Sequence, residues 1–198
     1  MRRDELEELH YITPIANMGS IDRLGILSHK RVEKIQHTTV AMAEIQELRA
    51  HKNIPSGRPL HDFVNLYLHA RNPMMYKRRA QHAELCVIRV SVDVLDLPGV
   101  IVTDSNAAAQ DQYVRFAAAP GGLGIVNRDE TFAESWNSPN YFEKCRLRSR
   151  KCAEVLVPDQ VGRQFLSGVY VSGHTGAEAY NALGLGLPVT INGHLFFR

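Results

Sequence analysis

The hydrophobic positions of this chain fall into short stretches bounded by turn-forming residues, a pattern typical of strands in a sheet. Residues 85–90 are the clearest stretch, because Arg89 is their only charged residue. Prolines stop others, as Pro158 stops residues 155–157. The stretches that predict strands are residues 9–13, 63–68, 85–90, 100–103, 155–157, 168–171 and 194–197.

Helical segments are fewer and more polar. Residues 15–24 predict a helix that ends at Gly25, because glycine readily adopts the left-handed conformation that closes a helix. Residues 41–51, 74–80 and 107–112 predict further helices, whereas the glycine-containing residues 120–149 are expected to be irregular. Because strands and helices do not alternate regularly, we predict an α+β fold with a mainly antiparallel central sheet and flanking helices.

Composition narrows the class of protein. The chain has 198 residues, of which 44% are hydrophobic and 22% charged, the balance of a globular protein that can bury a core. No low-complexity linker or internal repeat divides it, so we expect residues 1–198 to form a single domain.

The N-terminus and the cysteines indicate the compartment. The first eight residues include charged residues but no apolar region, and no stretch approaches about 18 apolar residues, so we expect neither export nor a membrane span. Three cysteines without a Cys-x-x-Cys spacing indicate neither a disulfide framework nor a zinc site. These features favour a reducing cytoplasm.

The net charge of +2 gives little support for nucleic-acid binding, but the basic residues cluster locally. One cluster surrounds Arg71 and residues 77–79, and another spans residues 144–151. If the second cluster is extended, its alternating arginines share one face and could follow a phosphate backbone. A solvated edge strand protected by charge explains the same pattern equally well. These arginines are Arg146, Arg148 and Arg150.

Glu154 lies directly before the apolar residues 155–157. A carboxylate at such a position is costly to bury without a partner or a chemical role. Glu154 is therefore either a paired structural residue or an active-site acid, and its own context leaves this choice open.

Several common sites are not indicated. The chain has no G-x-G-x-x-G, Walker or H-E-x-x-H motif, and residues 121–124 lack the strand and helix that flank a phosphate-binding loop. The nine histidines show no ligand spacing, so we predict no metal.

Three segments together resemble the DarT family, toxins that transfer ADP-ribose from NAD to a base of single-stranded DNA. They are the Tyr-Ile-Thr of residues 11–13 with residues 17–27, the run 60–76, and residues 152–158. The resemblance spans nearly the whole chain and implies an ADP-ribosyltransferase-like fold with NAD as co-substrate.

The resemblance also implies catalytic residues. Glu154 stands in an Ala-Glu-apolar-apolar-Val-Pro context like that of the family's catalytic glutamate. Arg49 follows an Ile-Gln pair within residues 34–52, as does the family's cofactor-contacting arginine, which is thought to assist removal of the base proton. Since arginine stays protonated, we expect Arg49 to position groups and stabilise charge.

Further residues are implied as contacts to NAD. Many relatives have a histidine at the position of Tyr11, whereas here His10 stands one residue earlier and would face the other side of a regular strand. His10 is therefore the weaker candidate. The implied cofactor contacts are Tyr11, Ile12, Thr13, Ser20, Ser28 and Arg49.

The implied partners are single-stranded DNA, with thymine as the usual base, and a DarG-like macrodomain antitoxin. Arginine contacts phosphates and methionine packs against unstacked bases. Two alternatives stay open: a nucleic-acid-binding module without activity, and the same chemistry on RNA or protein. The expected DNA contacts are Arg71, Met74, Met75, Arg146, Arg148 and Arg150.

Overall fold

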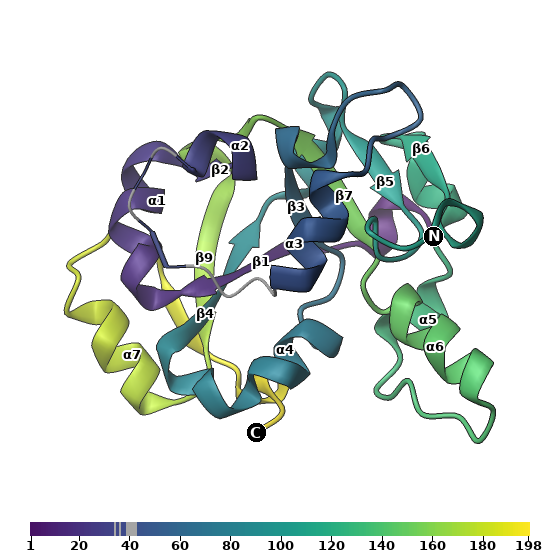
Figure 1. The fold of residues 1–198 in the computed structure, drawn as a ribbon. Helices are drawn as coiled ribbons and strands as arrows, with labels where there is room; N and C mark the ends of the chain where they lie inside the picture. Colours follow the sequence, from purple (N-terminus) through teal and green to yellow (C-terminus); the bar gives the residue numbers. More distant parts are fainter. Residues whose placement is uncertain (34, 36, 39–42) are drawn as a thin grey trace.

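An eight-stranded sheet forms the centre of the computed structural model, which describes residues 1–33, 35, 37–38 and 43–198 (Figure 1). The strand order is β10-β9-β4-β1-β3-β7-β5-β6; β9 and β10 pair in parallel and the other neighbours are antiparallel. The prediction of an α+β fold with a mainly antiparallel sheet is therefore confirmed. Its strands are β1 (Leu9–Pro14), β3 (Phe63–Tyr67), β4 (Leu85–Val90), β5 (Ile101–Thr103), β6 (Phe116–Ala118), β7 (Glu154–Pro158), β9 (Leu166–Val171) and β10 (Val189–Ile191).

Helices cover the sheet on several sides, and β2 (Ile26–Leu27) forms a separate antiparallel pair with β8 (Gln160–Val161). In Figure 1, α5 and α6 stand together on the right, away from α1 and α7 on the left. The helices are α1 (Met18–Leu24), α2 (His29–Val32), α3 (Ala43–Ala50), α4 (Pro73–Arg78), α5 (Arg128–Phe132), α6 (Tyr141–Arg150) and α7 (His174–Asn181).

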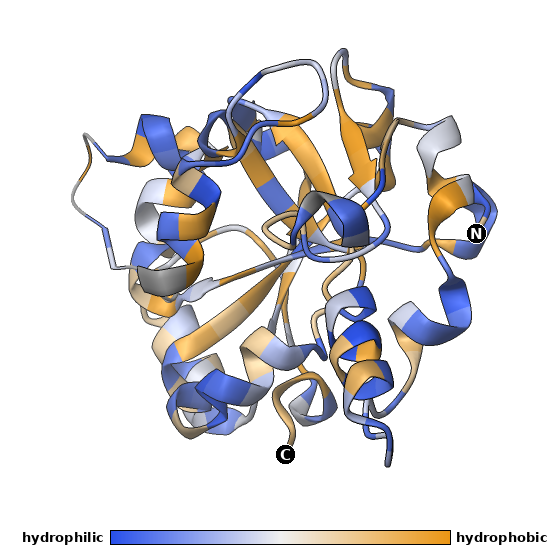
Figure 2. Cartoon of the chain, turned by 45° about the vertical axis from the view of Figure 1, so that its right-hand side comes forward, coloured by the Kyte–Doolittle hydropathy of each residue, from blue (hydrophilic) through white to orange (hydrophobic). Residues whose placement is uncertain are grey.

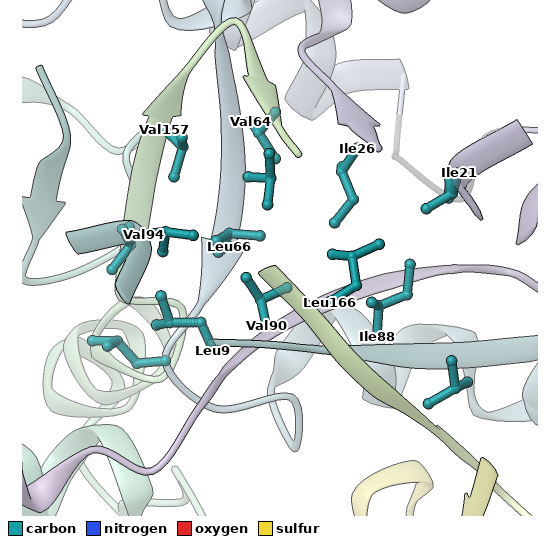
Figure 3. Packing of buried hydrophobic residues seen from close by; sticks show 14 of the residues in the cluster. Leu9, Ile21, Ile26, Val64, Leu66, Ile88, Val90, Val94, Val157 and Leu166 are labelled. Atoms are coloured by element: carbon teal, nitrogen blue, oxygen red, sulfur yellow. The ribbon is translucent and has the colours of Figure 1, made fainter. Parts of the chain in front are cut away.

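The main core lies against the strands β1, β3, β4, β7 and β9. Figure 3 shows side chains from these strands meeting Ile21 of α1 and Ile26 of β2. In Figure 2 the strands are mostly orange and the outer helices carry much blue, so apolar side chains concentrate inside. Burial of this apolar surface is the main stabilising contribution to such a fold.

Gly25 ends α1 as predicted. Its φ of 72° is left-handed, and its N–H donates to Ile21 O at 2.8 Å. A Cβ at this position would lie 2.3 Å from Val161 O in β8, so a larger residue would push the two segments apart.

Three segments differ from the predictions. Residues 120–149 are not irregular, because they contain α5 and most of α6. Residues 194–197 were expected to be a strand but belong largely to the 3-10 helix Gly193–Phe196. The helix expected over 107–112 is a set of turns followed by the 3-10 helix Asp111–Tyr113.

Residues 41 and 42 of the predicted helix 41–51, like 34, 36, 39 and 40, lie outside the described residues; the described helix is Ala43–Ala50. Among the described helices none has the length and apolar character needed to cross a membrane.

Candidate functional site

A pocket of about 460 Å³ opens where β1 and β7 meet α3, α4 and α6. Segments far apart in sequence supply its walls, since β1 and β7 flank β3 in the sheet and the helices pack around them. The lining includes Tyr11, Ile12, Thr13, Ser20, His29, Gln46, Arg49, His61, Met74, Lys77, Cys145, Arg148 and Glu154.

Glu154 and Arg49 form an ion pair in this pocket. Arg49 Nη1 lies 3.1 Å from Glu154 Oε2 and 3.3 Å from Oε1, and the side chains are 6% and 2% exposed. The backbone N–H of Ala107 donates to Glu154 Oε1 at 3.3 Å. Two buried donors therefore hold the carboxylate, which satisfies the pairing that a buried charge requires.

The other terminal nitrogen of Arg49 has a different environment. Nη2 is buried and has no hydrogen-bond partner within the described protein. Such a group is costly to leave unsatisfied, and functional sites are where such groups concentrate. One donor of the guanidinium is thus free for a ligand beside Glu154.

The sheet fixes the position of Glu154. It begins β7 opposite Tyr67 of β3, and its backbone N–H donates to Thr103 Oγ1 of β5 at 3.1 Å. Burial and the charge of Glu154 raise the pKa of Tyr67 well above its usual value, so this phenol stays neutral. Sequence analysis missed both Thr103 and Ala107, whose positions depend on the pairing of β5 with β7.

Most of the expected NAD contacts line the pocket, with one exception. Tyr11, Ile12, Thr13 and Ser20 belong to the lining, whereas Ser28 is 1% exposed and lies outside it. Its backbone N–H donates to Asp159 O beside the β2–β8 pair, and its buried Oγ has no hydrogen-bond partner among the described residues, so the contact between Ser28 and NAD stays a prediction.

His10 faces a different cavity, of about 290 Å³, together with Glu8 and His69. Its Nε2 lies 3.2 Å from Glu8 Oε1. Burial opposes ionisation of Glu8, but hydrogen bonds from His10 and Arg89 bring its pKa down to about 2. His10 is thus part of a structural ion-pair group and does not replace a pocket-lining histidine at position 11.

The structure separates the expected DNA contacts that lie in α4 or just before it. Met74 lines the pocket, but Met75 is fully buried in a cluster with Ile12 and Val87, so it cannot contact DNA. Arg71 lies outside the pocket lining: its guanidinium stacks on Phe197 at 4.0 Å and pairs with Glu134 at 3.3 Å. The expectation for Met75 is wrong because α4 turns consecutive residues to different sides.

The arginines of residues 146–150 do not form a row. They lie on the helix α6, where residues two apart point in nearly opposite directions. Arg146 pairs with Glu130 at 2.6 Å, and Arg150 contacts Asp104 and Glu130, whereas Arg148 lines the pocket. The single-face cation row predicted for an extended segment is therefore wrong, and Arg148 alone of the three lines the pocket.

The sequence prediction from histidine spacing also missed a cluster of potential metal ligands. His29, Glu33 and His61 each offer one atom that could hold a metal ion, and these atoms lie within 4.8 Å of one another. The signal in the sequence was the i, i+4 pair His29 and Glu33, which a helix places on one face.

Comparison with known proteins decides the family. The family model described as "ssDNA thymidine ADP-ribosyltransferase, DarT" matches residues 10–197. The chain belongs to the DarT family. A DNA ADP-ribosyl transferase of Thermus sp. (strain 2.9) is 38% identical over 162 residues, which cover 75% of this chain and 73% of that protein.

A second DarT relative is longer than this chain. A fusion protein of Thermosipho africanus (strain H17ap60334), described as a DNA ADP-ribosyl transferase joined to a DNA ADP-ribosyl glycohydrolase, is 32% identical over 173 residues. The match covers 84% of this chain but 43% of the fusion protein, so the chain spans less than half of that relative's length.

Solved DarT structures share the fold. Thermosipho africanus DarTG in complex with ADP-ribose has a TM-score of 0.82 and 28% identity, covering 96% of this chain and 51% of that one. Thermus sp. 2.9 DarT in complex with ADP-ribosylated ssDNA has a TM-score of 0.85 and 22% identity, covering 99% of both chains.

Proposed function

We propose that this chain transfers ADP-ribose from NAD to a base of single-stranded DNA, with thymine as the base. The observation that carries the proposal is the buried Arg49–Glu154 pair in the wall of a 460 Å³ pocket, where Arg49 Nη2 has no hydrogen-bond partner among the residues that the structure describes. Membership of the DarT family and the Thermus sp. structures with NAD+ and with ADP-ribosylated ssDNA support it.

In this reaction the bond between nicotinamide and C1 of the ribose breaks, and the sugar passes through an oxocarbenium-like state before the base attacks C1. Glu154 is the group that stabilises the developing positive charge, because its carboxylate is fixed by donors before the reaction begins. Nicotinamide leaves with the electron pair of the broken bond, a bond from C1 to the base forms, and the proton of the base passes to water.

Arg49 serves both substrates in this scheme. Nη1 orients the Glu154 carboxylate, and Nη2 is left to donate to the nucleotide or the incoming base. Because a guanidinium stays protonated near neutral pH, its contribution is orientation and charge stabilisation and not proton abstraction. NAD lies against Tyr11, Ile12, Thr13 and Ser20 in this proposal, and no metal takes part.

The DNA strand enters between α4 and α6, where Met74 and Lys77 line one side of the pocket and Arg148 the other. Two aromatic side chains at the start of α6 support this choice, since Tyr141 is 73% and Phe142 83% exposed. Exposed aromatic rings beside cations are the usual means of holding unpaired bases.

The biological role follows from the same relatives. We propose that the chain is the toxin of a toxin–antitoxin system that acts on DNA in the cytoplasm as a single domain over residues 1–198. The Thermosipho africanus relative joins a transferase to a DNA ADP-ribosyl glycohydrolase, which supports a DarG-like macrodomain antitoxin as the partner that reverses the modification.

Incubation with labelled NAD and, separately, single-stranded DNA, duplex DNA, RNA and protein tests the proposal. We expect label on single-stranded DNA that contains thymine, and none on an oligonucleotide that lacks it. Label on RNA or protein alone would favour the same chemistry on another substrate. Binding of DNA with no transfer would instead indicate a non-catalytic nucleic-acid-binding module.

A further inference from the structure

Three potential metal ligands from two separate segments converge at the edge of the pocket. His29 begins α2, Glu33 is the residue that caps this helix, and His61 lies in the 3-10 helix Leu60–Asp62. His29 Nε2 and Glu33 Oε1 are 3.4 Å apart, and the imidazole rings of His29 and His61 have their centroids 4.1 Å apart. One donor atom from each of the three lies within 4.8 Å of the other two.

A second observation points to a ligand at this place. Nε2 of His61 is buried and has no hydrogen-bond partner within the described protein. A buried ring nitrogen normally finds a donor or an acceptor, so an unpartnered one beside a second imidazole and a carboxylate is consistent with a group that binds from outside.

We propose that His29, Glu33 and His61 form a binding site for a divalent transition-metal ion of the Zn²⁺ type. Two imidazoles and one carboxylate match the protein ligands of open zinc sites, in which the fourth position is left to water or a small ligand. The separations are short enough for one ion to contact all three side chains after small rotamer shifts. Mg²⁺ and Ca²⁺ prefer oxygen ligands and do not fit this set.

The surroundings allow a cation here. Lys30, the neighbour of His29, pairs with Asp62 at 3.0 Å, so its ammonium charge is compensated. Glu33 is 59% exposed and His29 36% exposed, which gives an ion access from solvent. The bound ion would lie in the pocket wall, because His29 and His61 are both lining residues. This site goes beyond the transfer reaction, which needs no metal in the proposed scheme.

Titration of the whole chain with Zn²⁺ by calorimetry, and with Co²⁺ by visible absorption, tests the site without any activity measurement. We expect one ion per chain, the absorption of a low-symmetry Co²⁺ complex, and no comparable binding of Mg²⁺. His29→Ala, Glu33→Gln and His61→Ala should each weaken Zn²⁺ binding by about 100-fold or more, because even the loss of an outer-sphere partner costs about 10–100-fold.

His194→Ala is the matched control, because His194 also pairs with a carboxylate, Glu134, at 3.3 Å but does not belong to the three-residue cluster. It should bind Zn²⁺ like the unaltered protein. Glu33→Gln should fold like the unaltered protein, because the Glu33 side chain is largely exposed, so a loss of Zn²⁺ affinity in this variant reports on the site and not on misfolding. Absence of Zn²⁺ and Co²⁺ binding in the unaltered chain would overturn the proposal, and so would unchanged affinity in Glu33→Gln and His29→Ala.

Discussion

Arg49 and Glu154 are 105 positions apart in the chain and meet at 3.1 Å in the pocket wall. Their pairing joins α3, a helix outside the sheet, to the first residue of β7 inside it. Replacing either residue therefore changes both the charge that faces a substrate and the packing of these two elements.

Glu154→Gln should lower the rate of ADP-ribosyl transfer by roughly 10²–10⁴ and change NAD affinity far less, because the carboxylate acts on charge that appears only in the transition state. The glutamine keeps the size of the side chain and can still accept from Ala107 N–H. Single-turnover rates together with calorimetric NAD binding check this. A transfer rate close to that of the unaltered protein would remove Glu154 from the mechanism.

Arg49→Lys should not restore the activity that Arg49→Ala loses. A lysine ammonium cannot reproduce the planar fork in which Nη1 binds Glu154 while Nη2 remains available. Transfer rates and NAD affinity of the two variants, measured beside Glu154→Gln, give the comparison. Full activity in the lysine variant would show that any positive charge at this position suffices.

Arg148→Ala should reduce the magnitude of the log–log salt slope of single-stranded DNA binding by about 0.7, with little change in base preference. Arg146→Ala is the matched control on the same helix, because Arg146 is engaged by Glu130 at 2.6 Å and lies outside the pocket lining. Oligonucleotide titrations at several salt concentrations measure both slopes. Equal slopes for the two variants would place the DNA strand elsewhere.

Met74→Ala and Met75→Ala should have opposite consequences although the residues are adjacent. Met74 lines the pocket and is only partly buried against the apolar cluster of Met75, so its loss should alter base preference and lower stability less than the loss of Met75 does. Met75 is fully buried, so its loss should lower the free energy of unfolding by about 2–5 kcal/mol. Urea unfolding and oligonucleotide competition separate the two effects, and a stable Met75→Ala with altered base preference would contradict this division.

Part of the site could be predicted from the sequence because it depends on local pattern. The apolar residues after Glu154 predicted β7, and the position of Gly25 predicted the end of α1. The contact between Arg49 and Glu154 could not be derived in this way, since it depends on where α3 packs against the sheet. Long-range geometry of this kind is not encoded in any single stretch of residues.

The helices α5 and α6 were missed for a different reason. Most residues of α6 are polar, so its sequence lacks the periodic apolar positions by which helices are recognised. A local signal was nevertheless present: Asn127 and Asn140 each precede a glutamate by three residues, and their side chains accept from the backbone N–H of Glu130 and Glu143 at 3.1 Å. Asparagine at such a position is a favoured start of a helix.

The partly buried His69 leads to a prediction about how stability depends on pH. Burial, followed by the charge of Lys151, lowers the pKa of His69 to about 3, and Lys151 Nζ lies 3.1 Å from its Nδ1. As the pH falls below about 6.5, His69 becomes protonated in the unfolded state before it does so in the folded state. The stability that depends on a neutral His69 is therefore present above about pH 6.5 and is lost as the pH falls towards about 3.

Between pH 6.5 and 5, before the carboxylates titrate, this group should lower the free energy of unfolding by up to about 1.4 kcal/mol per pH unit. His69→Gln, which keeps an acceptor for Lys151 but does not titrate, should lack this part of the slope. Urea unfolding of both proteins across this range is the measurement. Parallel slopes would mean that His69 already carries its proton in the folded state.

Arg150 connects the end of α6 to Asp104, a carboxylate whose side chain is 1% exposed and which Arg115 also contacts at 2.6 Å. Hydrogen bonds from both arginines lower the pKa of Asp104 in spite of its burial, so it stays ionised. One side of α6 is thus anchored to the segment that follows β5, while Arg148 on another side lines the pocket. A substitution at Arg148 can therefore change the pocket wall without removing the contacts that hold the end of α6 in place.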